Sequence, residues 1–258
     1  MRTALTIAGS DSSGGAGIQA DLKTFAAHGV FGLSAITAVT AQNTVTVAAV
    51  GALDPDLVAA QVDVLIGDFA VHATKIGMLA NAGIGRAVAA AVERHRLKPL
   101  VLDPVMVAKG GARLLEDDAV DVLRARLLPL ATVVTPNAPE ASILAGLPVT
   151  TLAEQRAAAR QLTRLGAAAA LVKGGHLEGP AIDVLAIGDR VLEYRAERVA
   201  TRHTHGTGCT LSAAIAARLA LGDDLPEAVE AAKAYVSRAI AQAPGLGQGH
   251  GPLQHFPA

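Results

Sequence analysis

The chain has 258 residues, a formal net charge of −1 and an aromatic content of only 2%. The near-zero charge, with no run of Lys or Arg, excludes a strongly basic surface, so we expect neither a nucleic-acid nor a membrane partner. The scarcity of aromatic side chains also argues against stacking on single-stranded nucleic acid, while 51% hydrophobic residues predict a large aliphatic core.

Cys209 is the only cysteine of the chain, which excludes an internal disulfide and a metal-binding cysteine cluster. The N-terminal residues lack a long apolar signal segment, and no apolar run is long enough to span a bilayer. We therefore expect a protein of the reducing cytoplasm. Because no shift in composition suggests a linker, we also expect a single domain over residues 1–258.

Short aliphatic runs alternate with alanine-rich helical stretches along the chain. The aliphatic runs predict strands, in chain order, at 4–9, 33–39, 47–53, 73–78, 100–104, 131–137 and 169–175, and an antiparallel hairpin at 183–199. Helices are predicted at 17–29, 55–68, 84–95, after Pro139, and at 152–165, 208–221 and 226–241, before an extended glycine-rich tail. This alternation is typical of an α/β fold whose mostly parallel sheet is covered on both faces.

Ligands bind such sheets at the carboxyl ends of the strands, where this sequence gathers its glycines and polar residues. The first strand is followed by GSDSSGGAGIQAD, whose glycines let a ligand approach the backbone. Asp21, at the end of this segment, lies one turn into the next helix. A glycine-rich turn with Ser and Asp as helix caps explains the same segment equally well.

Three further strand ends carry side chains suited to a ligand. The Gln42 amide suits a flat heterocycle with a donor beside an acceptor, although a polar loop residue is the simpler interpretation. Met78 is either a soft pocket wall or core filler. Asp103 ends a buried strand, where an unpaired charge is costly, so it either faces a metal or another cation or caps backbone amides. The glycines of residues 108–112 suit a hinged lid.

Two more strand ends carry charged residues. Asn137 and Glu140 stand three residues apart at a helix start, so they share one face. Glu140 can hold Mg²⁺ there through water, because Mg²⁺ keeps several of its waters; the alternative is a helix cap favoured by the helix dipole. Lys173 follows the next strand and can reach a nucleotide phosphate, unless it is a solvated surface lysine.

Gly206, Thr207, Gly208 and Cys209 lead directly into a predicted helix. The first N–H groups of a helix are unpaired and carry partial positive charge, so glycines that expose them make a site for an anion. The segment matches neither the Walker A pattern G-x-x-x-x-G-K-[ST] nor G-x-G-x-x-G. We therefore interpret it as an anion-binding loop.

Taken together, the segments at the strand ends resemble the hydroxymethylpyrimidine/phosphomethylpyrimidine kinases of thiamine biosynthesis, which are ribokinase-like kinases. The resemblance runs in register from Ala4 to the region of Pro252, and the combination is specific although each motif alone is not. The segments are GSDSSGGAGIQADLKTF, TAQNT, KIGML, LDPVMVAKGG, TPNAPEA, KGGH and THGTGCTLSAAIA.

The resemblance implies a three-layer α/β/α sandwich around a mostly parallel sheet of about eight or nine strands. It also implies an enzyme that phosphorylates 4-amino-5-hydroxymethyl-2-methylpyrimidine with ATP and Mg²⁺, and then phosphorylates the monophosphate. Family members are commonly homodimers. The residues implied for the pyrimidine pocket are Gly9, Asp21, Gln42, Met78 and Val105. Those expected beside ATP are Asn137, Glu140, Lys173 and His205, with Glu140 and Asp103 at the metal and Gly206, Thr207, Gly208 and Cys209 as the catalytic anion hole.

Cys209 stands where many ribokinase-like enzymes have an aspartate that acts as general base. A permanent carboxylate there would repel the anionic monophosphate that is the second acceptor. We hypothesise that a thiol with a pKa of about 8.5, lowered by the helix N-terminus, tolerates both acceptors.

Three other functions compete with this interpretation. A pyridoxal kinase shares the scaffold and also phosphorylates a hydroxymethyl group on a flat ring. A cysteine hydrolase would pair Cys209 with His205 or His203, although a catalytic histidine usually comes from elsewhere in the fold. A non-catalytic ligand-binding relative is disfavoured because the charged positions that the chemistry needs are all present.

Overall fold

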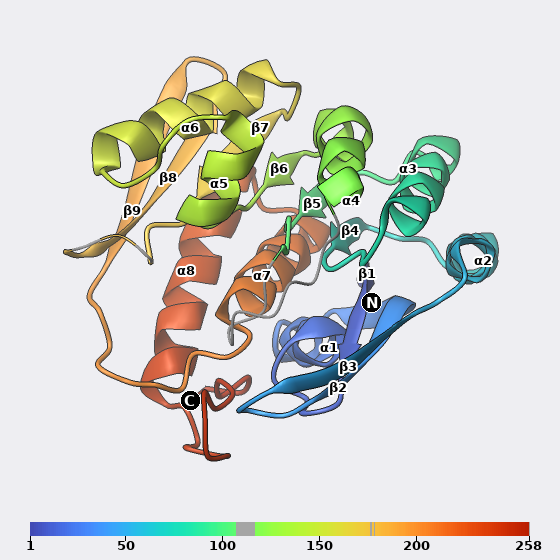
Figure 1. The fold of residues 1–258 in the computed structure, drawn as a ribbon, viewed down its shortest axis with the longest axis horizontal. Helices are drawn as coiled ribbons and strands as arrows, with labels where there is room; N and C mark the ends of the chain where they lie inside the picture. The colour runs from blue at the N-terminus through green and yellow to red at the C-terminus, as the bar shows by residue number, and fades with distance from the viewer. Residues whose placement is uncertain (107–116, 176, 178, 258) are drawn as a thin grey trace.

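The computed structural model describes residues 1–106, 117–175, 177 and 179–257, and within them one sheet of nine strands forms the centre (Figure 1). The strand order is β3-β2-β1-β4-β5-β6-β7-β8-β9. Neighbours from β2 to β7 are parallel, whereas β3 at one edge and β8 and β9 at the other are antiparallel, so the predicted mostly parallel sheet is confirmed. The strands are β1 Thr3–Asp11, β2 Phe31–Gln42, β3 Val47–Ala52, β4 Ala73–Ile76, β5 Leu100–Leu102, β6 Val133–Val134, β7 Ala169–Val172, β8 Ala181–Ile187 and β9 Arg190–Ala196.

Helices cover both faces of the sheet, which confirms the predicted three-layer α/β/α sandwich (Figure 1). Helices α1, α7 and α8 pack on one face, and α2 to α6 on the other. Within the described residues, none of these helices has the length and apolarity to cross a membrane. The helices are α1 Gly17–Ala27, α2 Pro55–Asp68, α3 Ala82–His95, α4 Asp117–Val122, α5 Ala138–Ala145, α6 Leu152–Arg164, α7 Thr207–Leu221 and α8 Leu225–Ala241.

The central strands divide their side chains between two hydrophobic cores, because successive residues of a strand point to opposite faces. In β5, Val101 belongs to the core with α1, α7 and α8, while Leu100 and Leu102 belong to the other core. In β7, Leu171 and Val172 divide in the same way. Since both faces are covered, the strands are apolar throughout and their polar groups gather at the ends.

Residues 117–130 are helical, although we predicted no element there. Helix α4 is followed at once by a π-helical turn, Leu123–Leu127, and by a 3₁₀ turn, Leu128–Leu130. Because three helical geometries succeed one another, no single 3.6-residue period extends across the segment. The predicted lid at 108–112 lies outside the described residues.

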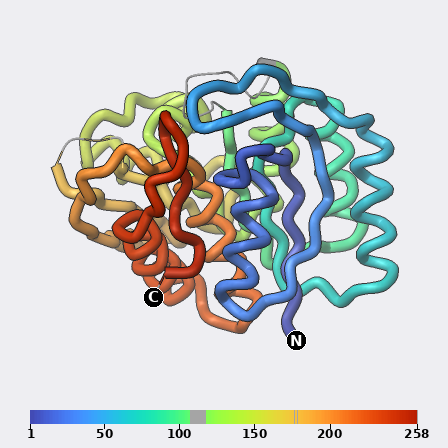
Figure 2. The backbone as a smooth tube through the Cα atoms, turned by 90° about the horizontal axis from the view of Figure 1, so that it is seen from below, coloured from blue at the N-terminus to red at the C-terminus, as the bar shows by residue number. Residues whose placement is uncertain are grey.

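The C-terminal tail lies against the turn between β2 and β3 (Figure 2). The His250 N–H donates to the Thr44 carbonyl oxygen at 2.9 Å, and the His205 N–H donates to the Gly251 carbonyl oxygen at 3.1 Å. A Cβ on Gly249 would lie 2.1 Å from the Thr44 carbonyl oxygen, so only glycine fits there. The tail thus links the β2–β3 turn to the start of α7.

Leu102 provides a test of the packing. Leu102→Ala should lower the free energy of unfolding by about 2–5 kcal/mol, because the side chain is fully buried and its loss leaves a cavity. The matched control is Leu57→Ala on α2, where the side chain is 53% exposed and the loss should stay within about 0.5 kcal/mol. Urea unfolding measures both; similar midpoints for the two variants would contradict the assignment of Leu102 to the core.

Candidate active site

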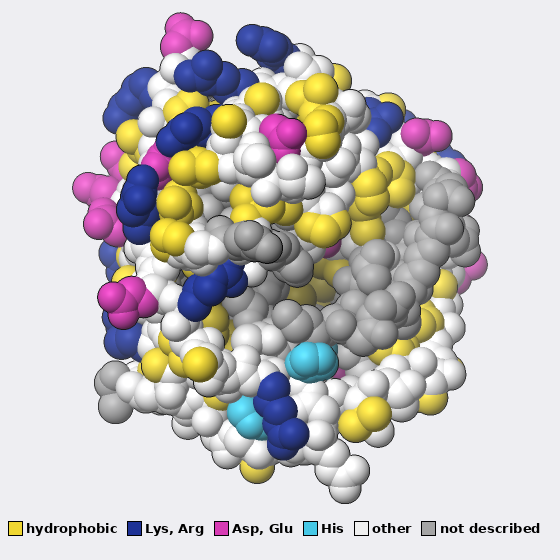
Figure 3. All heavy atoms as spheres, turned by 60° about the vertical axis from the view of Figure 1, so that its left-hand side comes forward, with side chains coloured by type: hydrophobic (Ala, Val, Ile, Leu, Met, Phe, Trp, Pro, Cys, Tyr) yellow, Lys and Arg dark blue, Asp and Glu magenta, His cyan; other side chains and the backbone are white. Residues whose placement is uncertain are grey.

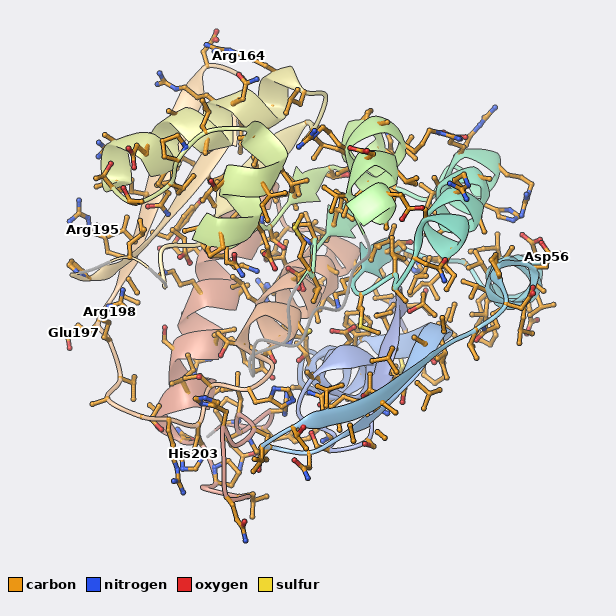
Figure 4. The ribbon with its side chains drawn as sticks, in the orientation of Figure 1. Asp56, Arg164, Arg195, Glu197, Arg198 and His203 are labelled. Atoms are coloured by element: carbon orange, nitrogen blue, oxygen red, sulfur yellow. The ribbon has the colours of Figure 1, made fainter. Side chains whose placement is uncertain are left out.

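A cavity of about 1000 Å³ lies at the carboxyl ends of the parallel strands. Figure 3 shows the surface hollowed on one face, with histidine and basic side chains at the margin of the hollow. The connection from β9 to α7 runs along this side, with Glu197 and Arg198 at its beginning and His203 near its end (Figure 4). The predicted site residues that line the cavity are Gly9, Gln42, Met78, Asp103, Val105, Asn137, Glu140, Lys173, His205, Gly206, Thr207, Gly208 and Cys209.

Asp21 is the predicted site residue that does not line the cavity. It lies on the buried face of α1, and its carboxylate Oδ2 accepts hydrogen bonds from Lys75 Nζ at 2.8 Å and from Thr6 Oγ1 at 2.6 Å. The side chains of Asp21 and Lys75 are both fully buried. Asp21 therefore belongs behind the pocket, as the partner of Lys75, and not beside the ring where we expected it.

Lys75 is a cavity residue that we missed in the sequence. Burial alone would lower the pKa of Lys75, but the Asp21 carboxylate, with smaller effects of Cys209 and Asp103, raises it, so the ammonium is held charged. The available signal was a lysine inside the otherwise apolar strand ATKI, because a buried charge requires a partner.

The start of α7 has the geometry of an anion-binding loop. Gly206 adopts the left-handed conformation with φ of 81°, and a Cβ on it would lie 1.8 Å from the Gly15 carbonyl oxygen, so no other residue fits. Within the described residues, no backbone carbonyl accepts from the N–H of Gly208 or Cys209. Both amides are therefore available to an anion in the cavity.

Lys173, Asp103 and Glu140 form a charged cluster beside this loop. Lys173 Nζ donates to Asp103 Oδ1 at 3.0 Å, and lies 3.3 Å from the position of a Cβ built on Gly208. Burial would lower the pKa of Lys173, but Asp103 and Glu140 raise it. Burial, together with the charge of Asp103, raises the pKa of Glu140 to about 7, against the opposing effect of Lys173.

Asn137 and Glu140 form a capping box at the start of α5, which was the alternative we weighed for this pair. The Glu140 N–H donates to Asn137 Oδ1 at 2.9 Å, and the Asn137 N–H donates to Glu140 Oε2 at 2.8 Å. Both residues also line the cavity. The cap therefore holds the Glu140 carboxylate toward the cavity, and the structural and functional interpretations are compatible.

Cys209 is half-buried, and the Gly17 backbone lies close enough to its thiol to lower the pKa of that thiol slightly. Burial raises the pKa of the thiol to about 11, and the charges of Asp21 and Asp103 add to this rise, while Lys75 opposes it. Our hypothesis of a lowered pKa is therefore wrong, because desolvation outweighs the helix N-terminus. The thiol is neutral at physiological pH.

His205 lies beside Gln42 in the cavity lining, and its predicted position beside ATP stays a prediction. Its Nε2 lies 2.8 Å from Asp11 Oδ2 and 3.4 Å from Gln42 Nε2. Because its Nε2 faces Asp11, it gives no support to a Cys209–His205 hydrolase pair. Asp11 is a second residue that we missed; burial would raise its pKa, but hydrogen bonds from His205 and Ser13 lower it to about 2.

Comparison with known proteins agrees with this geometry. The profile of the phosphomethylpyrimidine kinase family matches residues 11–254. The chain belongs to this family. The hydroxymethylpyrimidine/phosphomethylpyrimidine kinase of Rhizobium meliloti is 53% identical over 98% of the chain and 96% of that protein. The thiamine biosynthesis bifunctional protein ThiED of Geobacter sulfurreducens is 49% identical over 98% of the chain, which spans about half (52%) of that longer protein.

Solved structures of two kinds of vitamin kinase share the fold of this family member. The pyridoxal kinase of Bacillus subtilis, solved as an ADP complex, superposes with a TM-score of 0.93 at 42% identity, covering 99% of the chain and 97% of that structure. The phosphomethylpyrimidine kinase of Clostridium difficile superposes with a TM-score of 0.84, also at 42% identity, covering 93% of the chain and 100% of that structure. The fold alone therefore does not distinguish the two substrates.

Alkylation of Cys209 tests its neutral state. At pH 7.5 the folded protein should react with iodoacetamide at least roughly a hundredfold more slowly than the urea-unfolded chain, whose thiol has a pKa of about 8.5. The rate in the folded state should rise through pH 10 to 11 as the thiol ionises. Mass spectrometry of timed samples measures the rate at the single cysteine; a plateau below pH 9, with circular dichroism unchanged, would contradict the raised pKa.

Proposed function

We propose that this enzyme transfers the γ-phosphoryl group of ATP to 4-amino-5-hydroxymethyl-2-methylpyrimidine and then to the resulting monophosphate. Its membership of the phosphomethylpyrimidine kinase family supports the proposal. The observation that carries it is the position of the start of α7, which has Lys173 on one side and His205 with Gln42 on the other. An anion bound there lies between two parts of the cavity. We call the Lys173 side the nucleotide end and the side of His205 and Gln42 the ring end.

Gly9, Gln42, Met78 and Val105 form the proposed ring pocket. A Cβ on Gly9 would lie 2.5 Å from Met78 Cε, so the glycine makes room for the thioether to lie against a flat ring. The Gln42 amide supplies a donor and an acceptor. One apolar wall and one polar edge are what a small substituted heterocycle requires.

Lys173 and the exposed amides of α7 are proposed to hold the phosphates of ATP. Phosphoryl transfer requires positioned donors and neutralised charge more than covalent chemistry. Lys173 is well suited, because Asp103 fixes its Nζ at 3.0 Å next to the helix start. The reaction needs the cytoplasmic pool of ATP, and we propose a cytoplasmic location on that ground.

Asp103 and Glu140 fit a Mg²⁺ ion. Both carboxylates are buried, and the pKa of Glu140 is raised to about 7 by burial and by Asp103, so a nearby dication would relieve two negative groups held close together. Mg²⁺ keeps several waters and needs few protein ligands, so the lack of a cluster of three or more ligating side chains within the described residues is no obstacle. When bound, Mg²⁺ offsets charge on the phosphates of ATP.

The neutral Cys209 thiol is suited to both acceptors. Next to the anionic monophosphate it adds no repulsion, whereas a carboxylate at this position would. With a pKa of about 11 it also does not act as a resting base for the alcohol. Its proposed contribution is to close the anion-binding loop with a small uncharged side chain.

Substrate tests decide between this function and a pyridoxal kinase. Purified protein with ATP and Mg²⁺ should release ADP with the pyrimidine alcohol and with its monophosphate, as a coupled assay measures. Turnover of pyridoxal without turnover of either pyrimidine would overturn the proposal. The monophosphate is decisive, because a kinase limited to alcohols does not extend it.

Lys173→Met and Glu140→Gln should each lower kcat by about 10²–10³, because each removes charge or orientation that the transition state uses. The matched controls are Lys98→Met and Glu230→Gln, whose side chains are exposed and lie outside the cavity lining. Turnover of the cavity variants within a factor of three of their controls would contradict the assignment of both residues to the nucleotide end.

We propose that the partner of this chain is a second copy of itself. The β2–β3 ribbon lies at the edge of the sheet, and β3 is exposed at all positions but the first although its sequence is VAAVGA. Val39 and Val50 on the ribbon are 49% and 43% exposed. An apolar edge strand of this kind is a template for association.

Val50→Lys should convert a dimer of the wild-type chain to a monomer, because a charge on the ribbon opposes apolar contact. Val64→Lys, at a 70% exposed position of α2 outside the ribbon, serves as the control and should leave the dimer intact. Sedimentation velocity at micromolar concentration measures both. A monomeric wild-type protein would contradict the proposal directly.

A further inference from the structure

A chain of hydrogen bonds at the ring end of the cavity links Asp11, His205, Gln42 and Thr40. His205 Nε2 lies between the Asp11 carboxylate and the end of the Gln42 side chain, and Thr40 Oγ1 lies 3.2 Å from the other side of that amide. Asp11, His205 and Thr40 are all buried. We propose that Asp11, His205 and Thr40 are positioning residues that fix which way the Gln42 amide points, and with it the ring that the pocket accepts. This inference rests on the proposed function and names the residues that set its specificity.

The protons at Asp11 fix the state of His205. Asp11 Oδ1 accepts from the Ser13 N–H at 2.8 Å, and Oδ2 accepts from the Ala16 N–H at 2.8 Å. A carboxylate that accepts from backbone amides in this way is ionised and offers no proton. His205 Nε2, 2.8 Å from Oδ2, must therefore carry a hydrogen and donate it.

The position of His205 is itself held from several sides. The His205 backbone N–H donates to the Gly251 carbonyl oxygen, and His205 forms an isolated parallel β-bridge with Pro252. A Cβ on Gly15 would lie 2.6 Å from His205 Cδ2, so the ring packs directly on the glycine-rich loop. The imidazole therefore has little freedom to turn its Nε2 away from Asp11 and Gln42.

Thr40 fixes the other side of the Gln42 amide. Its hydroxyl has a single hydrogen, and the Ser10 carbonyl oxygen, 3.0 Å away, accepts it. Toward Gln42, Thr40 Oγ1 is then an acceptor. With the amide oxygen facing Thr40, the NH₂ group would meet the His205 N–H donor at 3.4 Å and Thr40 would need a second hydrogen. With the amide turned over, its NH₂ donates to Thr40 and its oxygen, instead of a second donor, faces the His205 N–H, whose single hydrogen is directed to Asp11.

The orientation of Gln42 determines the pattern that a ligand meets. Once one amide N–H is donated to Thr40, the other amide N–H and a carbonyl lone pair remain for a ligand. A 4-aminopyrimidine presents a ring nitrogen beside an exocyclic amino group, which matches an amide donor and acceptor side by side in one order only. The pyridoxal ring has no amino group next to a ring nitrogen. A fixed amide therefore favours the aminopyrimidine, and an amide free to turn loses part of that preference.

The primary test is His205→Leu, assayed with the pyrimidine alcohol, with pyridoxal and with varied ATP. The KM for the pyrimidine should rise about tenfold, as expected for loss of one buried hydrogen bond, while the KM for ATP stays within a factor of two. The ratio of kcat/KM for pyrimidine to that for pyridoxal should fall to a similar degree. His205→Gln should restore most of the loss, because its NH₂ group can donate to Asp11 and to Gln42 together.

Thr40→Val is the second variant, because it keeps the shape of the side chain and leaves the start of α7 untouched. It should reproduce the rise in pyrimidine KM without a change in ATP KM. The matched control is His95→Leu, since His95 Nε2 also lies 2.6 Å from an aspartate, Asp63, but on the surface and away from the cavity. His95→Leu should leave unchanged the KM for the pyrimidine, the KM for ATP, and kcat/KM for the pyrimidine and for pyridoxal.

Two results would overturn the positioning role. One is an unchanged pyrimidine KM in Thr40→Val and in folded His205→Leu; the other is an equal rise in the KM for ATP, which would indicate general damage to the site. If His205→Leu does not fold, Thr40→Val alone decides. Absence of pyrimidine turnover in the wild-type protein would instead contradict the proposed function, so the two failures are distinguishable.

Discussion

The site depends on the contact between the start of α7 and the glycine-rich loop that follows β1. Only a glycine fits at position 206, because the Gly15 carbonyl oxygen occupies the place where a side chain would begin. The hydrogen bond between His205 Nε2 and Asp11 closes the same contact. Two segments nearly two hundred residues apart in the chain thereby form one wall of the cavity, from which the exposed amides of α7 and the Gln42 end of the cavity both take their positions.

The fold follows from the apolar strands, and for that reason much of it was predictable. A strand such as LVL, buried on both faces, leaves its polar neighbours no place except the end of the sheet. Asp103, Lys173, Gln42 and the α7 loop were found in the sequence by this rule alone, and all of them line one cavity. The edge hairpin was also predictable, because Gly188-Asp189 interrupts two alternating runs.

What the sequence did not reveal depends on neighbours that only the folded chain brings together. Asp21 appeared to be a ring-binding residue until Lys75 was found against it, and the side of the cavity on which His205 lies is set by Asp11 and by the tail. The pKa of Cys209 shifts in the direction opposite to our prediction for the same reason. A helix start alone would lower this pKa, whereas burial beside Asp21 and Asp103 raises it. The helical structure of residues 117–130 was not predicted because its geometry changes twice, from α to π and then to 3₁₀.

The packing of His205 and the C-terminal tail on the first loop has a consequence for synthesis. The contacts that complete the cavity join residues at opposite ends of the chain, and loop closure of this length is slow and comes late. A nascent chain emerging from the ribosome holds most of its sheet before it holds the second half of its binding wall. Ligand affinity is therefore expected to develop after the sheet, whose nine strands all lie within residues 3–196, once the segment 205–252 has packed on the first loop.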